Sequence, residues 1–319
     1  MARADAPGLA WRCAWILAAG CCAAGPVSSH AKEMLPLWEA GIGLGYTRLP
    51  DYRGSDEAHG YVLPFPLIVY RGDFFNRPVL YNPYQHIAQQ FVTLAEAVGS
   101  TDVPTVKRLV SQSSLRLPPL LLQPGELDAA RDALGQRHAS IANRPLVFLC
   151  PGAGLLPIRA WPVESFSTVA RHFVEQGYAV AIVGVAADRE VAQRIQQDCQ
   201  HAACIDLTGY TKTMRDVAVL LHLGVLLITN DGGTGHIASL TPISSIVLFG
   251  PETPMLYGTL SPRAVNLYKP LSCSPCLTAY NHQRSPCDGN NVCLKSISPQ
   301  EVLVVANDLI HRAQETSQN

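Results

Sequence analysis

Short apolar segments alternate with amphipathic helical segments from residue 146 onward, and this alternation constrains the fold more than any other feature. Each apolar segment has the length of a strand rather than that of a buried helix. Strands that alternate with helices predict a parallel sheet with helices on both faces, an α/β fold. We expect strands at Leu146–Cys150, Tyr178–Val183, Ile205–Leu207, Leu226–Thr229 and Ser245–Phe249, and helices at Pro162–Gln176, Asp188–Cys199, Met214–Leu223, after Gly233, and from Pro299 to about Gln314.

Residues 1–31 have the order of features that is typical of an export signal. Arg3 and Arg12 precede the apolar stretch Cys13–Ala24, and a small-x-small cleavage pattern follows at Ser29–Ala31. The same region matches a lipoprotein processing site in which Cys21 would carry the lipid, and a disordered leader is the plain alternative. The order of charge, apolar core and cleavage pattern favours a signal-like leader and therefore export.

Residues 32–75 differ in composition from the rest of the chain. Small and apolar residues alternate over Ala40–Tyr46, a turn-rich stretch follows, and Tyr61–Tyr70 is a second extended run, which predicts two paired strands. The block resembles the start of the MipA/OmpV family of outer-membrane barrel proteins, and the matching pieces are Trp38–Gly41, Pro50–Ser55 and Val69–Asp73. Two strands cannot close a barrel, so we expect a short β-hairpin-like segment without a barrel function.

The charge balance excludes one class of partner. The formal net charge is -1, without the basic stripe that nucleic-acid-binding proteins present. Hydrophobic residues make up 48% of the chain, which is typical of a globular protein. No apolar run reaches the ~18–20 residues that a membrane-spanning helix needs.

A glycine-containing loop follows the first strand expected after residue 145. Gly152 and Gly154 lie within it, and Arg159 comes shortly afterwards. Open parallel sheets bind ligands at the carboxyl ends of their strands, where glycines let the backbone come close to a bound group. Arg159 can add a fixed positive charge to a pyrophosphate. Taken alone, however, Pro-Gly-x-Gly favours an ordinary turn.

The strongest motif is the stretch Asn230–His236, which follows an apolar strand. Asp231, Gly232, Gly233 and Thr234 form a glycine-rich turn into a helix, an arrangement suited to a diphosphate. His236 can reach back to the phosphate, or it is a structural histidine on the first helical turn.

A third loop, Asp206–Thr211, offers hydroxyl groups. Thr208 and Thr211 can donate to a ligand, but Thr211 or Thr213 more readily caps the helix that begins near Met214.

Several motifs in a fixed order carry a resemblance to a known family. They are Pro-Gly-x-Gly with Arg159 and Trp161-Pro162, Gly184 with Asp188, Asp206–Gly209, Asn230–His236, and Leu248–Pro254. Together they resemble glycosyltransferase family 9, which includes the ADP-heptose:lipopolysaccharide heptosyltransferases. The resemblance begins at about Arg77 and is dense from Pro145. It implies a GT-B fold of two Rossmann-like domains with the donor held in the C-terminal one, and an inverting, metal-independent transfer that requires no cofactor.

The resemblance also implies a donor, an acceptor and a location. The donor would be ADP-heptose or a related nucleotide sugar, and the acceptor a lipopolysaccharide core or lipid-linked molecule, at the cytoplasmic face of the inner membrane. The loop Asp231–His236 matches the donor-diphosphate loop of the family. Arg159 lies near its basic phosphate contact, and Asp188 lies where the ribose or base is expected. A cytoplasmic donor conflicts with an export leader.

The family's N-terminal domain supplies the acceptor site and an acidic catalytic base, and here that domain is expected to be incomplete. Residues 76–140 are interpreted as its remnant and a connector, with helices at Tyr84–Val98 and Glu126–Gln136, and residues 141–319 as the nucleotide-sugar-binding domain. The catalytic base is unassigned, so we expect weak donor binding and impaired transfer. The alternative is a non-catalytic nucleotide-binding or envelope-associated fusion protein. A dinucleotide oxidoreductase is disfavoured, because no Gly-x-Gly-x-x-Gly opens the first βα unit.

Four cysteines are closely spaced near the C-terminus: Cys273, Cys276, Cys287 and Cys293. Their spacing admits a structural zinc site, two disulfides in an exported protein, or reduced thiols.

Overall fold

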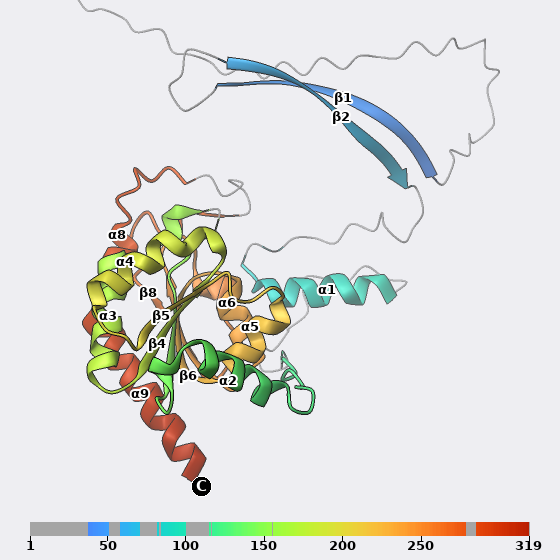
Figure 1. Cartoon of the computed structure of the whole chain (residues 1–319). Coiled ribbons are helices and arrows are strands. Elements are labelled where there is room, and N and C mark those ends of the chain that lie inside the picture. Colours follow the sequence, from blue (N-terminus) through green and yellow to red (C-terminus); the bar gives the residue numbers. More distant parts are fainter. Residues whose placement is uncertain are drawn as a thin grey trace, which may run out of the picture. The chain divides into compact units, whose positions relative to one another are not determined.

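The computed structural model describes residues 38–50, 58–70, 82, 84–99, 115, 117–154, 156–278 and 285–318. The chain divides into two compact units, Met1–Arg77 and Pro78–Asn319. In the first unit, β1 (Trp38–Pro50) and β2 (Ala58–Tyr70) pair antiparallel, from Trp38 opposite Tyr70 to Pro50 opposite Ala58 (Figure 1). The two paired strands expected from the sequence are therefore present. The predicted leader, residues 1–31, lies outside the described residues.

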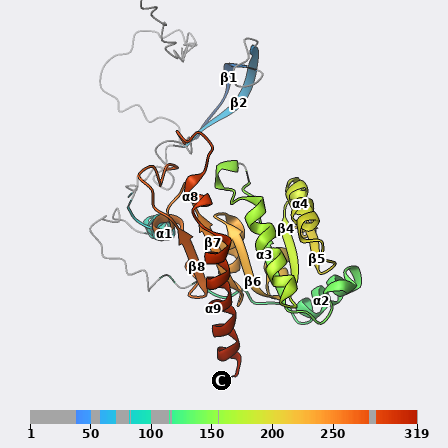
Figure 2. The same ribbon diagram turned by 90° about the vertical axis from the view of Figure 1, so that its left-hand side faces the viewer.

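The second unit is built on six parallel strands in the order β5-β4-β3-β6-β7-β8 (Figure 2). The chain runs outward from β3 to β5 and then crosses to β6, so the strand order reverses between β3 and β6. Ligands of open parallel sheets bind at such a switch point. The strands are β3 (Leu146–Cys150), β4 (Ala179–Gly184), β5 (Cys204–Thr208), β6 (Gly224–Asn230), β7 (Ser244–Phe249) and β8 (Ala264–Tyr268).

Helices cover both faces of this sheet, as the alternation of segments predicted. On one face α3 packs against α4 and α9, and on the other α5 packs against α2 and α6 (Figure 1). Two short helices and α1 complete the unit. The helices are α1 (Ile87–Gly99), α2 (Glu126–Arg137), α3 (Val163–Glu175), α4 (Arg189–Cys199), α5 (Met214–Leu221), α6 (Gly233–Ala238), α7 (Pro254–Tyr257), α8 (Val292–Lys295) and α9 (Pro299–Gln318).

The threonine cap expected before Met214 is confirmed at Thr213. Its hydroxyl accepts a hydrogen bond from the Asp216 amide at 3.1 Å, and the Asp216 carboxylate accepts one from the Thr213 amide at 2.9 Å. This reciprocal capping box satisfies backbone donors that have no partner inside the helix, and it fixes where α5 begins.

The core lies along the central strands, and β3 is buried over its whole length. Phe148 on β3 faces Gly224 at the start of β6. A Cβ at Gly224 would lie 2.5 Å from Phe148 Cε2 and 3.1 Å from Ile243 Cδ1. The glycine therefore makes room for an aromatic ring rather than providing a special backbone conformation.

Substituting Gly224→Ala is expected to lower the free energy of unfolding by about 1–3 kcal/mol, the usual cost of overpacking a tightly filled core. Urea denaturation followed by circular dichroism measures this. Gly177→Ala is not a suitable control, because Gly177 has a φ of 88°. Gly135→Ala is suitable, because nothing lies within 4 Å of a Cβ at that position. Equal stability of the two variants would contradict the packing described here.

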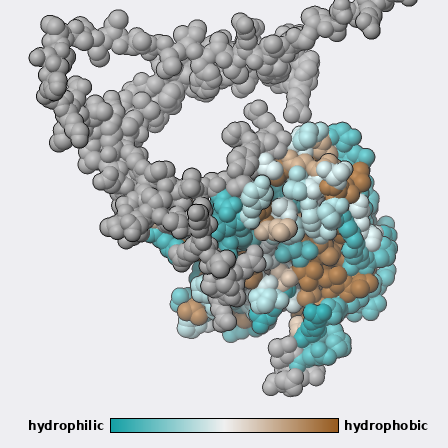
Figure 3. All heavy atoms as spheres, turned by 180° about the vertical axis from the view of Figure 1, so that it is seen from behind, coloured by the Kyte–Doolittle hydropathy of each residue, from teal (hydrophilic) through white to brown (hydrophobic). Residues whose placement is uncertain are grey.

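Large apolar side chains on the surface are spread over several elements of the second unit. Examples are Phe91 and Leu94 on α1, Met214 on α5 and Val304 on α9. Seen from behind, the apolar areas of the described surface are interrupted by hydrophilic ones (Figure 3). Within the described residues, no helix has the length and apolar content that crossing a membrane requires.

Candidate functional site

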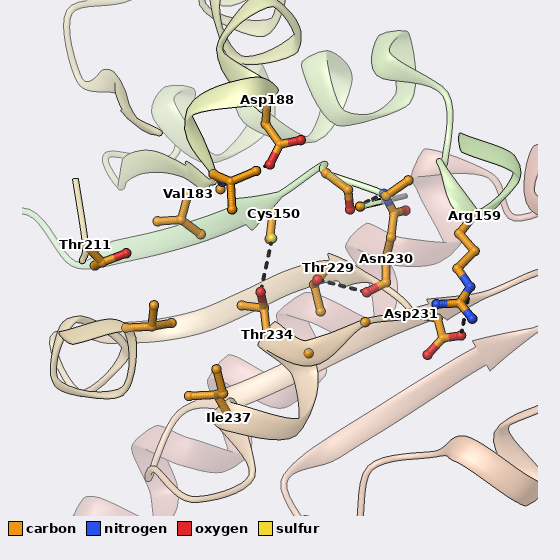
Figure 4. A pocket seen from close by; sticks show the side chains of 18 of the residues that line it. Cys150, Arg159, Val183, Asp188, Thr211, Thr229, Asn230, Asp231, Thr234 and Ile237 are labelled. Atoms are coloured by element: carbon orange, nitrogen blue, oxygen red, sulfur yellow. Dashed lines mark hydrogen bonds and ion pairs between the residues drawn. The ribbon is translucent and has the colours of Figure 1, made fainter. Parts of the chain in front are cut away.

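A cleft of about 560 Å³ opens at the carboxyl ends of β3, β4 and β6, where the strand order reverses. Such a volume suits a small-molecule ligand. Arg159 and Asp231 lie at one end of it and Thr211 at the other (Figure 4). Apolar side chains also line the cleft, among them Val183, Leu207, Val217, Leu220, Leu221 and Ile237.

Most predicted site residues line this cleft. The structure brings together Gly152, Gly154, Arg159, Asp188, Asp231, Gly232, Gly233 and Thr234. They come from the loops after β3, β4 and β6, which are far apart in the sequence. His236 lines an adjoining cavity, and Thr208 lines neither.

Thr208 is held by the protein itself. The Arg189 guanidinium donates to the Thr208 carbonyl oxygen at 3.2 Å and lies 3.5 Å from its hydroxyl. Neighbouring residues of a strand point to opposite faces, so Leu207 reaches the cleft and Thr208 does not. The interpretation of Thr208 as a ligand donor is therefore not supported by its position.

Asn230 joins the loops after β3 and β6, although the sequence analysis did not include it among the site residues. Its Nδ2 donates to the Pro151 carbonyl at 2.7 Å, and its Oδ1 accepts from the Trp161 amide at 3.0 Å. The side chain is almost fully buried. A polar residue at the last position of an apolar strand was the signal for this role.

Asp188 is packed between two glycines. A Cβ at Gly152 or at Gly184 would lie 2.5 Å from its Oδ2. The same oxygen accepts a hydrogen bond from the Val185 amide at 2.9 Å. Asp188 therefore shapes the turn after β4 as well as lining the cleft.

Gly232 and Gly233 leave space that the protein does not fill. Nothing lies within 4 Å of a Cβ at Gly233, and at Gly232 only the Asn230 carbonyl does, at 3.9 Å. Neither residue has a φ that demands glycine. The protein fold itself does not need glycine here, so the open space is available to a ligand. Next to them, the Thr234 hydroxyl accepts from the Cys150 thiol at 3.4 Å.

Arg159, Asp231 and Glu252 form a buried charged cluster at one end of the cleft. Arg159 Nη2 donates a hydrogen bond to Glu252 Oε1, and Arg159 Nε lies 4.0 Å from Asp231 Oδ2. Among the described residues, neither Arg159 Nε nor Asp231 Oδ2 has a hydrogen-bond partner. Burial, together with the hydrogen bond and negative charge of Glu252, raises the pKa of Asp231 to about 7, and Arg159 opposes the shift.

A second cavity of about 340 Å³ adjoins the cleft at this cluster. The two share Arg159, Asp231, Gly232 and Gly233, and the second is otherwise lined by His236, Glu252, Tyr257 and Thr278. Its lining offers carboxylates, hydroxyls and an imidazole, which suit a polyhydroxylated ligand.

His236 on α6 lines this second cavity, and His86, just before α1, is buried. Desolvation of its ring lowers the pKa of His236, which favours a neutral imidazole at neutral pH. His86 Nδ1 accepts from the Ala88 amide at 3.2 Å, so its Nε2 carries the proton and donates to the Gly258 carbonyl at 2.9 Å. His86 thereby anchors the start of α1 to the segment after α7.

The four clustered cysteines surround a different cavity of about 230 Å³. Cys273, Cys287 and Cys293 carry free thiols, and burial raises the pKa of Cys293. Within the described part of the chain, no group of three or more His, Cys, Asp or Glu side chains is placed to hold a metal ion. The arrangement therefore does not support the zinc interpretation or a disulfide between these three cysteines.

The segment that contains these cysteines instead forms hydrogen bonds to the backbone next to Arg159 and Glu252. Asn291 Nδ2 donates to the Ile158 carbonyl at 3.0 Å, next to Arg159. The amides of Cys276 and Leu277 donate to the Pro251 carbonyl at 2.8 and 2.9 Å, next to Glu252.

With this geometry in place, the comparison with protein families is decisive. The profile of glycosyltransferase family 9 (heptosyltransferase) matches residues 70–285, more than half of the 319-residue chain. The chain belongs to glycosyltransferase family 9.

Curated relatives of this family 9 chain are heptosyltransferases. It is 30% identical over 189 residues to lipooligosaccharide heptosyltransferase 2 of Haemophilus ducreyi, covering 58% of this chain and 52% of the relative. It is 29% identical over 174 residues to lipopolysaccharide heptosyltransferase 2 of Escherichia coli, covering 53% and 48% respectively. The chain thus spans about half the length of the curated relatives that it matches.

Solved family 9 structures have the same fold. ADP-heptose lipopolysaccharide heptosyltransferase II of E. coli aligns with a TM-score of 0.51 and 25% identity, over 62% of this chain and 54% of that one. A family 9 glycosyltransferase of Veillonella parvula aligns with a TM-score of 0.56 and 22% identity, over 74% and 63%. The six-stranded parallel sheet with helices on both faces therefore matches GT-B-type heptosyltransferases, as the sequence predicted.

Proposed function

We propose that this chain holds the nucleotide diphosphate-sugar donor of a heptosyl transfer reaction, with ADP-heptose or a related ADP-sugar as the ligand. The observation that carries the proposal is the pair of adjoining cavities that share Arg159, Asp231, Gly232 and Gly233. A nucleoside fits the larger, partly apolar cleft, and a sugar fits the smaller polar one. The diphosphate between them then lies against the shared wall.

Each residue of that wall has a chemical role in this proposal. The Arg159 guanidinium neutralises the diphosphate, which is the leaving group of the transfer. Gly232 and Gly233 let the phosphates approach the backbone, because no side chain fills the space beside them. Asp231 and His236 then face the sugar hydroxyls, and Asp188 faces the ribose.

We propose a lipopolysaccharide core acceptor, because the relatives are named as lipopolysaccharide or lipooligosaccharide heptosyltransferases. Membership of family 9 supports the further proposal of transfer with inversion and without a metal, at the cytoplasmic face of the inner membrane. No residue of this chain is assigned as the catalytic base. We therefore expect donor binding to be retained more fully than transfer.

Binding of the donor is the first test. Titration calorimetry of ADP and ADP-heptose into the full chain should give one site. Gly233→Val is expected to weaken binding about tenfold or more while leaving thermal stability unchanged, because the new methyl groups enter space that is otherwise open. Gly135→Val is the matched control, since a Cβ there also meets nothing within 4 Å, but on α2 away from the cleft. Failure of the folded protein to bind either ligand would contradict the proposal.

Transfer is tested separately with ADP-heptose and a deacylated lipopolysaccharide core acceptor. Slow or absent product formation by a protein that binds ADP-heptose fits the expectation above. Turnover as fast as that of a complete heptosyltransferase would show that the base is present in this chain.

A second candidate is a nucleotide-binding protein of the envelope that does not catalyse transfer. It is favoured by the hairpin of β1 and β2, which forms a compact unit separate from the transferase fold, and by the resemblance of Leu37–Phe75 to MipA/OmpV proteins. Cell fractionation with an antibody against the chain separates the two candidates.

A further inference from the structure

The charges around the proposed diphosphate site have an unexpected sign. Among the described residues that line the two cavities, one arginine faces three carboxylates, and there is no lysine. Asp231 and Glu252 are each only 6% exposed. A diphosphate brings further negative charge, and like charges brought together out of water repel strongly.

The single cation is already engaged. Arg159 Nη2 donates to Glu252, as an arginine does to a phosphate oxygen. Arg159 Nε and Asp231 Oδ2 face each other at 4.0 Å, each without a hydrogen-bond partner. Within the described part of the chain these two buried atoms therefore lack hydrogen bonds, and a bound group that donates and accepts can supply them.

The other titratable groups around the cluster offer no second positive charge. From α6 His236 faces it, with a pKa lowered by desolvation of its ring. From α7 comes Tyr257, and the nearest other carboxylate in the cleft is Asp188, after β4. The proton that Asp231 and Glu252 can share is thus the one local means of reducing the negative charge.

We propose that Glu252 occupies on Arg159 the place that a phosphate oxygen of the donor takes, and that the donor displaces it, so that Glu252 couples donor binding to proton uptake. The inference rests on the proposed function, because it requires a diphosphate at Arg159. When Glu252 leaves the guanidinium, it keeps its hydrogen bond to Asp231, and the two carboxyls share one proton. Glu252 is thus a positioning residue that sets the pH range in which the donor binds.

The direction of the pH effect follows from the charges. In the free protein the Asp231 carboxyl holds its proton up to about pH 7. In the complex, the negative charge of the phosphates and of the released Glu252 raises the pKa of Asp231 further, so that Asp231 keeps its proton to a higher pH. Below about pH 7 the proton is present in both states, and above it binding requires uptake of about one proton. The dissociation constant should therefore rise with pH above neutrality.

The test uses ADP-glucose, whose two phosphates are both esterified and do not titrate near neutrality, unlike the terminal phosphate of ADP. Calorimetry at about pH 6.5 and about pH 8.5, in buffers of different ionisation enthalpy, gives both the affinity and the protons taken up. For the wild type we expect about tenfold weaker binding at the higher pH and uptake of about one proton there. Glu252→Gln should bind about tenfold more tightly than the wild type at the higher pH, with little uptake, because one buried negative charge is gone.

Glu164→Gln is the matched control, since Glu164 on α3 forms an exposed ion pair with Arg194 on α4 and should behave as the wild type. If Glu252→Gln binds ADP-glucose more weakly at both pH values, Glu252 merely holds Arg159 in place and the inference is wrong while the donor site stands. The same conclusion follows if wild-type binding takes up no proton. If no folded variant binds ADP-glucose at either pH, the donor site itself is absent, and both the inference and the proposed function fail.

Discussion

Replacing Arg159 by methionine is expected to weaken the binding of an ADP-sugar about a hundredfold, the largest functional effect that we predict for a single residue. Arg159 is the one cation among the described residues that line the two cavities. Its removal leaves Asp231 and Glu252 buried without a positive partner, and it removes a bidentate donor from the diphosphate. Calorimetric titration of ADP-glucose at about pH 6.5 measures the effect where proton uptake contributes least.

Two further variants test whether the loss of affinity is specific to the guanidinium of Arg159. Arg194→Met removes an arginine from a solvent-exposed ion pair with Glu164 and should leave affinity unchanged. Arg159→Lys should lie between the wild type and Arg159→Met, because lysine keeps the charge but loses the planar fork. An Arg159→Met protein that binds within about threefold of the wild type would place the diphosphate elsewhere.

The largest effect on stability is expected for Trp161→Ala, at about 3–5 kcal/mol of the free energy of unfolding. Trp161 is 1% exposed, and its ring packs edge-to-face on Phe166 with centroids 4.9 Å apart. Its Nε1 donates to the Ile297 carbonyl at 2.9 Å, which ties the loop before α3 to the segment before α9. The alanine variant therefore leaves both a cavity and a buried carbonyl without its partner. Urea denaturation followed by circular dichroism gives the difference.

Trp161→Phe separates the two contributions, because it keeps most of the apolar volume and loses only the hydrogen bond. We expect it to cost about 1–3 kcal/mol. Val304→Ala, at a position 70% exposed on α9, should change stability by less than about 0.5 kcal/mol. If Trp161→Ala behaves like Val304→Ala, the ring does not carry the contact between these segments.

The fold was largely predictable because its inner strands are continuous apolar runs. The strand expected at Leu146–Cys150 was confirmed with the same bounds, and the terminal helix begins at Pro299 as expected but runs on to Gln318. The strand Ala264–Tyr268 was missed, since every residue in it is only half-buried at the sheet edge and Asn266 interrupts the apolar pattern. The short helices α7 and α8 are too brief for a helical period to be visible in the sequence.

Site residues that directly follow a strand could be predicted from the sequence. Site residues whose role depends on a contact with a residue far away in the sequence could not. Asp231 and Arg159 were placed in the site from their loops, and the structure brings them together. Glu252 was missed, because it does not follow its strand directly as Asp231 does: Gly250 and Pro251 separate it from the end of β7. Its pairing with Arg159 spans 93 positions of sequence, and no local pattern records such a contact. Thr208 does not line either cavity, and the face that its side chain takes could not be predicted because strand register is not visible in a short strand.

The packing of Asp188 between Gly152 and Gly184 also restricts how this site can change over generations of substitution. A Cβ at either glycine would collide with the Asp188 carboxylate, so an alanine at position 152 or 184 requires that carboxylate to move. Replacing Asp188 by a smaller residue first removes that obstacle, although it also removes the acceptor for the Val185 amide. Substitutions at the three positions therefore depend on one another, and replacement of Asp188 is expected to come before replacement of either glycine. Libraries that vary one position at a time will yield mostly damaged proteins, whereas a simultaneous change of all three positions can be tolerated.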